Sequence, residues 1–292
     1  MTSSPRRIAL AAALFLPPLL LGPTARAAEP AKQQAGKFVW FDLLTEDVAA
    51  AQKFYGSLLG WTFEPQKGSN PPYVIASLGG KHVAGLVSIK HMKKDVPVSQ
   101  WLAYASVADV DKAVAAAKKL GATVHREPFE VEGAARAGVF SDPFGALVGV
   151  AKLKKGDPAD ELPSDGAFLW MEYLAADPEK AIAFYGSVLS YEASPHEGQG
   201  GLNRPYWALK GAGISRAGLY LNPFEKVSPH WLPYVRVADP AALAAKAASL
   251  GGRVAFEPKP EVRGGSVALV IDPTGAAFAL QKWPLKQAGS KP

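Results

Sequence analysis

Two short segments of the chain place a carboxylate two residues after a tryptophan. Trp40 is followed by Asp42, and Trp170 is followed by Glu172, at an offset of 130 residues. Because side chains alternate between the two faces of a strand, each tryptophan shares a face with its acid. An acid flanked by apolar residues is costly to bury unpaired, and an aromatic wall beside it suits a planar or cationic ligand. Asp42 and Glu172 are therefore candidate ligand-binding groups, or general acids or bases.

A second strand candidate in each half also carries aromatic and polar side chains on one face. Tyr104 and Ser106 share a face, and Tyr234 and Arg236 occupy the equivalent positions. Together with the tryptophans and acids they would make a mostly apolar pocket with a few polar groups, which is the usual composition of a small-molecule site. We therefore include all four as candidate ligand-binding residues. A role for Arg236 predicts that Arg236→Ala weakens an anionic ligand in the second half only.

Each of these residues also has a purely structural explanation. Tryptophans and tyrosines on strands commonly belong to a core. Asp42 is equally explained by pairing with the backbone or with Arg136, and Glu172 by pairing with Arg236. Both alternatives stay open at the level of the sequence.

The rest of the composition excludes several other kinds of site. The chain contains no cysteine, so disulfides, thiolate metal ligands and a cysteine nucleophile are excluded. The five histidines do not recur between the halves and lack metal-ligand spacing; His82 is the one that we consider as a base. No nucleophile elbow, phosphate loop or nucleic-acid motif is present.

Four pairs of segments define an internal repeat with an offset of 130 residues. They are Phe38–Leu43 with Phe168–Tyr173, Phe54–Ser57 with Phe184–Ser187, Trp101–Tyr104 with Trp231–Tyr234, and the Asp-Pro-x-Gly segments at Asp142 and Asp272. In the middle the offset slips to 133, which a loop at residues 194–203 would absorb. We expect domains at residues 36–153 and 166–284, joined by a polar linker at 154–165.

The elements of the first copy follow from periodicity and capping residues. Strands are predicted at 38–43, 73–78, 83–89, 102–107, 123–127, 136–141 and 147–151. Helices are predicted at 48–59 and 110–120, each begun by an aspartate and ended by a glycine. Each copy thus contains two β-α-β-β-β units, and the whole chain contains four.

Residues 1–27 have the three regions of a secretory signal peptide. Two arginines precede an apolar run, and Ala25 and Ala27 provide a cleavage site after Ala27. Two prolines interrupt the run, which falls short of the roughly 20 residues that span a bilayer. We expect a periplasmic or secreted protein, by the general or the twin-arginine route. Loss of Arg6, Arg7 and Arg26 leaves 29 basic against 26 acidic side chains, which does not favour nucleic acid.

The β-α-β-β-β order, the segment Asp-x-x-x-Ala-x-x-Phe-Tyr-x-x-x-Leu-Gly-Trp at Asp47, and the two Asp-Pro-x-Gly turns resemble the vicinal oxygen chelate superfamily. This superfamily includes glyoxalase I, bleomycin-resistance proteins and extradiol dioxygenases. The resemblance covers nearly the whole chain after the leader. It implies an α+β fold of two tandem domains, in each of which a pair of β-α-β-β-β modules forms an incomplete barrel around a cleft.

The resemblance also implies where a divalent metal would be bound. The first ligand lies fourteen residues before the Phe of the Phe-Tyr pair, the second near the start of the fifth strand, and the third seven residues after the Asp of Asp-Pro-x-Gly. These positions hold Trp40, Leu102 and Gly149 in the first copy and Trp170, Leu232 and Ala279 in the second. None of these side chains can bind a metal.

The sequence therefore predicts an exported protein that binds a small molecule in its clefts without a metal or other cofactor. The alternative is a lyase, isomerase or dioxygenase of the same superfamily that uses a metal, or Asp42 or Glu172 as general acid or base. A scaffold without ligand is a third reading, because a fold does not fix a function. We expect no nucleic acid partner and no stable membrane insertion after cleavage. A monomer is favoured over a homodimer because the tandem copies supply the pairing within one chain.

Overall fold

The computed structural model describes residues 32–69, 72–90, 99–196, 204–224 and 226–284. The expected leader at 1–27 and His91 lie outside the described residues. Among the helices that the structure describes, none has the length and apolar character needed to cross a bilayer.

The described chain forms two successive halves with the same order of elements. The first half comprises β1 (Phe38–Thr45), α1 (Val48–Leu59), β2 (Thr62–Pro65), β3 (Tyr73–Leu78), β4 (Lys81–Ser88), β5 (Gln100–Ser106), α2 (Val110–Lys119), β6 (Thr123–Val131), β7 (Ala135–Ser141) and β8 (Leu147–Leu153). The second comprises β9 (Phe168–Ala175), α3 (Pro178–Leu189), β10 (Glu192–Pro195), β11 (Tyr206–Gly211), β12 (Ile214–Leu221), β13 (His230–Arg236), α4 (Pro240–Ser249), β14 (Arg253–Phe256), the short 3₁₀ turn Arg263–Gly265, β15 (Val267–Ile271) and β16 (Ala277–Gln281).

Each half forms one mixed, open sheet of eight strands. The order is β2-β3-β4-β1-β5-β8-β7-β6 in the first and β10-β11-β12-β9-β13-β16-β15-β14 in the second. The first strand of each module pairs in parallel with the last, and the two modules join where β1 runs antiparallel to β5. Two tandem α+β domains are thus confirmed, each an open sheet rather than a closed barrel.

The four helices begin at aspartates, as their sequences predict. Asp47, Asp109, Asp177 and Asp239 each accept a hydrogen bond from a backbone N–H of the first turn, at 3.0–3.1 Å. Such a cap contributes about 1 kcal/mol to helix stability. Gly60 ends α1 in the left-handed conformation with φ 76°, the region that glycine adopts without steric cost.

Two strands escaped the sequence prediction. β2 and β10 have four residues each, end in proline and lie at the sheet edges, so they lack the alternating apolar pattern of a longer strand. β2 and β10 differ by 130 residues whereas β3 and β11 differ by 133. The slip in the repeat therefore falls between Pro195 and Tyr206.

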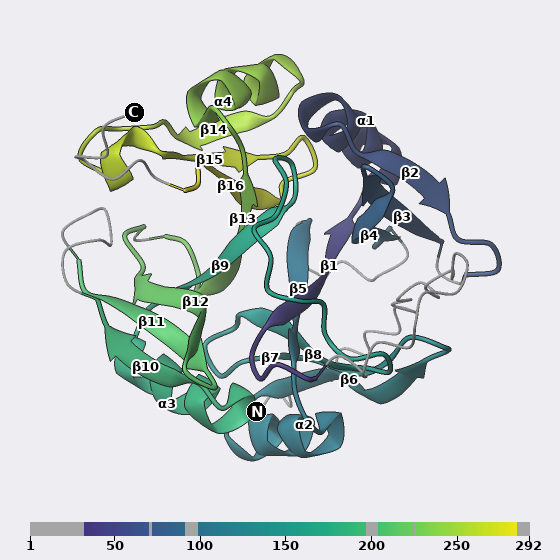
Figure 1. Cartoon of the computed structure of the whole chain (residues 1–292), viewed down its shortest axis with the longest axis vertical. Helices are drawn as coiled ribbons and strands as arrows, with labels where there is room; N and C mark the ends of the chain where they lie inside the picture. The colour runs from purple at the N-terminus through teal and green to yellow at the C-terminus, as the bar shows by residue number, and fades with distance from the viewer. Residues whose placement is uncertain (1–31, 70–71, 91–98, 197–203, 225, 285–292) are drawn as a thin grey trace, which may run out of the picture.

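The helices lie between the two domains, where they pair with one another. α1 contacts α4 and α2 contacts α3, which places one pair at the top and the other at the bottom of Figure 1. Two clusters of buried apolar side chains draw on both domains, one around α2 and α3 and the other around α1 and α4. The hydrophobic effect therefore favours keeping the two domains docked.

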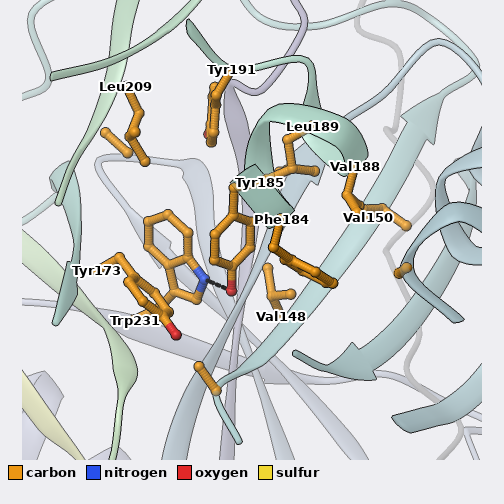
Figure 2. Close-up of a cluster of buried hydrophobic side chains, with 14 of the residues drawn as sticks. Val148, Val150, Tyr173, Phe184, Tyr185, Val188, Leu189, Tyr191, Leu209 and Trp231 are labelled. Carbon is orange, nitrogen blue, oxygen red and sulfur yellow. Dashed lines mark hydrogen bonds between the residues drawn. The ribbon is translucent and has the colours of Figure 1, made fainter. Parts of the chain in front are cut away.

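Tyrosines and tryptophans reinforce this shared core. Figure 2 shows Tyr185 of α3 beside Tyr173 and Trp231, with the Trp231 indole nitrogen donating to the Tyr185 hydroxyl at 2.8 Å. The Tyr173 and Tyr185 hydroxyls both donate to Oδ2 of Asp142 in the first domain, at 2.7 Å. The Asp-Pro-x-Gly turn is thus a docking point for the other domain.

The segment between β8 and β9 is fixed by contacts along its length. Asp157 accepts from the backbone N–H of Gln34 at 2.6 Å. Asp160 forms ion pairs with Lys37 and Arg216 at 2.8 and 2.6 Å. The connection therefore forms part of the surface beside the second sheet.

The other face of each sheet, turned away from the helices, carries a separate cluster. We call it the site face, because it holds Trp40 in the first domain and Trp170 in the second. Phe41 and Leu43 point to the opposite face, into the shared cores, as strand alternation requires.

Candidate ligand-binding site

The acid of the first domain is sealed inside a hydrogen-bonded cluster on the site face. Tyr73 donates to Oδ1 of Asp42 at 2.7 Å, and the Trp40 indole nitrogen donates to the same oxygen at 2.9 Å. The Tyr104 hydroxyl faces Asp42 but has no hydrogen bond of ordinary geometry among the described residues. Asp42, Tyr73 and Tyr104 are each 1% exposed, so a ligand would have to displace protein to reach the carboxylate.

A glycine on the neighbouring strand makes this cluster possible. Gly85 lies opposite Asp42 in the β1–β4 register, and a Cβ there would lie 1.8 Å from the Tyr73 hydroxyl oxygen. Burial raises the pKa of Asp42 to about 6, although the hydrogen bonds from Tyr73 and Trp40 act in the opposite direction. Desolvation thus outweighs the hydrogen bonds, since it penalises the charged form.

The second domain repeats the acid and its two tyrosines and adds a cation. Tyr206 donates to Oε1 of Glu172 at 3.1 Å, and Tyr234 donates to Oε2 at 2.5 Å. Arg263 forms an ion pair with Oε1. The Glu172 side chain is 1% exposed and that of Arg263 is 12% exposed. Since a buried carboxylate needs a partner, this guanidinium allows Glu172 to remain charged.

Arg263 reaches the site from an unusual turn between β14 and β15. Arg263, Gly264 and Gly265 have φ values of 50°, 62° and 76°. A side chain other than glycine seldom adopts this region, and such strain is concentrated at functional sites. The position 130 residues earlier is Gly133, so the first domain has no equivalent arginine.

A cavity of about 500 Å³ opens on the outer side of the Glu172–Arg263 pair. Trp170, Tyr206 and Trp283 form aromatic walls, and Leu162 and Pro163 of the interdomain segment close one side. A smaller cavity of about 60 Å³ lies on the inner side, between Tyr220, Phe224, Leu232 and Phe256. The ion pair therefore divides the space over the site face into two compartments.

The structure brings six of the eight predicted site residues together in two groups of three. Trp40, Asp42 and Tyr104 belong to one cluster, and Trp170, Glu172 and Tyr234 to the other. The remaining two, Ser106 and Arg236, do not join them. The hydroxyl of Ser106 is buried with no hydrogen-bond partner among the described residues.

Both arginine pairings proposed for the acids are wrong. Arg236 donates to the carbonyl oxygens of Pro163 and Trp283, each at 2.7 Å, and lies 3.4 Å from Asp165. It therefore ties the interdomain segment to the end of the second sheet. Arg136 binds Asp111 at 2.6 Å and Glu130 at 3.2 Å, because it points to the helix side of β7.

Several site residues were missed by the sequence analysis. Tyr73 and Tyr206 recur at the slipped offset of 133, each directly after a proline, a pattern that pairs them in the two copies. His196 and Gln281 line the larger cavity, but neither recurs. Arg263 could not have been found, since its partner is 91 residues away. His82 is exposed at the start of β4, away from this cavity.

The side chains over the site faces do not suit a divalent metal. No group of three or more histidine, cysteine, aspartate or glutamate side chains converges anywhere in the described part of the chain. Each site face presents one carboxylate surrounded by tyrosines, and in the second domain Arg263 already neutralises it. A metal centre requires several N or O donors to converge, which this set does not provide.

Comparison with known proteins identifies both repeats. Residues 37–150 match the model of the Glyoxalase/Bleomycin resistance protein/Dioxygenase superfamily, and residues 170–281 match that of the Glyoxalase-like domain. The chain is 35% identical over 245 residues to "Putative glyoxylase CFP32" of Mycobacterium tuberculosis, covering 83% of this chain and 93% of the relative. It is 30% identical over 263 residues to the anthracycline biosynthesis protein DauV of Streptomyces sp., covering 84% and 92%.

Solved structures share the fold at low sequence identity. The Mn(II)-bound glyoxalase from Novosphingobium aromaticivorans superposes with a TM-score of 0.57 at 17% identity, covering 85% of this chain and 82% of that one. The 2,3-dioxygenase LapB from Pseudomonas sp. KL28 gives 0.56 at 14% identity, covering 89% and 98%. With its repeated modules, matched family models and full-length relatives, the chain belongs to the glyoxalase, bleomycin resistance protein and dioxygenase superfamily, the vicinal oxygen chelate superfamily.

Proposed function

We propose that this protein binds a small, planar molecule in the second domain and that the first domain supports it structurally. The contrast between the two acids carries the proposal. Glu172 and Arg263 lie at the floor of a cavity of about 500 Å³, a size in the range of small-molecule sites. Asp42 occupies the equivalent place beneath tyrosines that are 1% exposed.

The walls of the cavity favour an aromatic ligand. Trp170 and Tyr206 are half-buried, whereas their counterparts Trp40 and Tyr73 are 8% and 1% exposed. Exposed faces of tryptophan and tyrosine offer stacking surface to a flat molecule. The relative DauV is named for anthracycline biosynthesis, which makes polycyclic aromatic compounds the first class of ligand to test.

We propose further that binding is independent of a metal and that the protein acts outside the cytoplasm. The first proposal is supported by the donor set, since the six family ligand positions hold Trp40, Leu102, Gly149, Trp170, Leu232 and Ala279. The second is supported by residues 1–27, whose pattern is that of a cleaved leader. Amino-terminal sequencing of protein from the periplasm or medium should begin at Ala28; uncleaved protein retained in the cytoplasm would contradict export.

An enzyme that uses a carboxylate as general acid or base is the second candidate. Its support is the pKa of Asp42, which burial raises to about 6, into the range where a carboxyl group exchanges protons near neutral pH. Glu172 is the better placed of the two acids, because it faces a cavity. Turnover of a bound ligand that is lost in Glu172→Gln would favour this candidate over simple binding.

The binding proposal is tested by filling the cavity. Ser215 lines it and is exposed on β12, so Ser215→Trp adds bulk without disturbing a core. His82 is the equivalent exposed position of the first domain, and His82→Trp is the matched control. Calorimetric titration with an anthracycline and with 2-acetylnaphthalene should show binding that falls at least about tenfold in Ser215→Trp only. No binding of either probe to the unsubstituted protein, or equal losses in both variants, would contradict the proposal.

A further inference from the structure

We infer that the polar end of the ligand is an uncharged carbonyl oxygen, which accepts hydrogen bonds from Arg263. This inference rests on the proposed binding site and names the chemical class that it selects, an aromatic ketone, quinone or amide. It follows from the hydrogen-bond capacity and the charge of the groups at the floor of the cavity.

Glu172 has little capacity left for a ligand. Oε1 already accepts from Tyr206 and Arg263, and Oε2 accepts from Tyr234. The side chain is only 1% exposed. Glu172 therefore serves to hold the tyrosines and the guanidinium in place rather than to meet the ligand itself.

Arg263, in contrast, keeps donors available. A guanidinium carries five N–H donors. One donates to Glu172, and a second approaches Oε1 of Gln281 at 3.4 Å. Arg263 lines both the larger and the smaller cavity, so its remaining donors face the space that a ligand would fill. The strained turn that carries it fixes the direction of this donor group.

The charge balance decides between a neutral and an anionic acceptor. The charged side chains known to line the larger cavity are the carboxylates Glu161 and Glu172 and the single guanidinium of Arg263. Because Glu172 already neutralises Arg263, an added carboxylate would leave an excess negative charge in a poorly solvated site. A carbonyl oxygen accepts the same hydrogen bonds without that cost.

Three ligands of one shape separate these alternatives. We would measure by calorimetry the binding of 2-acetylnaphthalene, 2-naphthoate and 2-ethylnaphthalene, which carry a ketone, a carboxylate and no oxygen. The ketone should bind roughly fivefold more tightly than the hydrocarbon, as expected for one hydrogen bond, and more tightly than the carboxylate. A carboxylate that binds best, or three equal affinities, would overturn the inference while leaving the binding site intact. Absence of binding by all three would overturn the proposed function as well.

Two variants test the residues themselves. Glu172→Gln removes the charge that neutralises Arg263, so the preference should shift toward 2-naphthoate. Glu172→Gln combined with Arg263→Met removes both charges and the donors, and the ketone should then bind no better than the hydrocarbon. Retention of the original ranking in both folded variants would overturn the inference. If either variant fails to fold, the ranking of the three ligands on the unsubstituted protein still decides it.

Discussion

The hydroxyl of Tyr185 in the second domain lies 2.7 Å from Oδ2 of Asp142 in the first. The relationship is reciprocal, because Tyr55 of the first domain donates to Oδ2 of Asp272 at 3.0 Å. Two of the motifs that define the repeat, the Phe-Tyr pair and the Asp-Pro-x-Gly turn, thus contact each other across the domain interface. Their recurrence reflects docking between the copies and not chemistry within either cleft.

Removal of these hydroxyls should cost unequal amounts of stability. Tyr185 accepts from the Trp231 indole nitrogen as well as donating to Asp142, whereas the equivalent Trp101 nitrogen lacks a partner of normal geometry among the described residues. Tyr185→Phe should lower the free energy of unfolding by about 2 kcal/mol and Tyr55→Phe by about 1 kcal/mol. Urea denaturation of the two variants checks this order, and a larger loss in Tyr55→Phe would contradict it.

Most of the fold could be predicted because it is written in local patterns. Helix α1 begins at the capping Asp47 and ends before Gly60 as predicted, since both signals act on the adjacent backbone. β2 was missed because its four residues carry no period. The sheet order followed from the resemblance, and not from any property of a single strand.

The site was predictable only where alternation along one strand decides it. Trp40 and Asp42 share a face because they are two residues apart, and their hydrogen bond at 2.9 Å follows. The partner of Glu172 could not be inferred, because Arg263 comes from a turn distant in sequence. Arg236 was the plausible choice as the nearest cation on a neighbouring strand, yet it binds the interdomain segment instead.

The buried Asp42 should make stability depend on pH in a defined direction. Burial raises its pKa in the folded protein to about 6, above the value of about 3.9 in an unfolded chain. Between these values the folded state holds a proton that the unfolded state has released. The stability that Asp42 contributes is therefore fully present below about pH 4 and is lost as the pH rises through 6.

Asp42→Asn isolates this effect, because asparagine does not ionise. The free energy of unfolding of the unsubstituted protein, relative to Asp42→Asn, should fall by on the order of 3 kcal/mol between pH 4 and pH 7. Chemical denaturation at several pH values measures the difference. Parallel curves for the two proteins across this range would show that Asp42 ionises as an ordinary exposed aspartate does.

Two equivalent glycines should respond differently to the same substitution. A Cβ at Gly85 would lie 1.8 Å from the Tyr73 hydroxyl oxygen and 2.4 Å from Oδ1 of Asp42, and a Cβ at Gly218 would lie 2.0 Å from the Tyr206 hydroxyl oxygen. Tyr73 is fully enclosed, whereas Tyr206 borders the larger cavity. Gly85→Ala should therefore destabilise by about 3 kcal/mol and Gly218→Ala by about 1 kcal/mol, because only Tyr206 has space to move. Thermal unfolding checks the order, and an equal loss in both would show that Tyr206 is held as rigidly as Tyr73.

Metal loading should fail for a reason that the site makes specific. After exposure to Zn, Ni, Mn and Fe(II) and dialysis, we expect less than about 0.1 equivalent of metal per domain, because each site face offers a single carboxylate. Glu172 could join a metal only by releasing Arg263, which would leave the guanidinium unpaired and half-buried. The control is Trp170→His combined with Ala279→Glu, which places two donors where the superfamily has them and should raise the metal content. Close to one equivalent in the unsubstituted protein would mean that the donors come from elsewhere in the chain, and glyoxalase and dioxygenase activities should then be assayed.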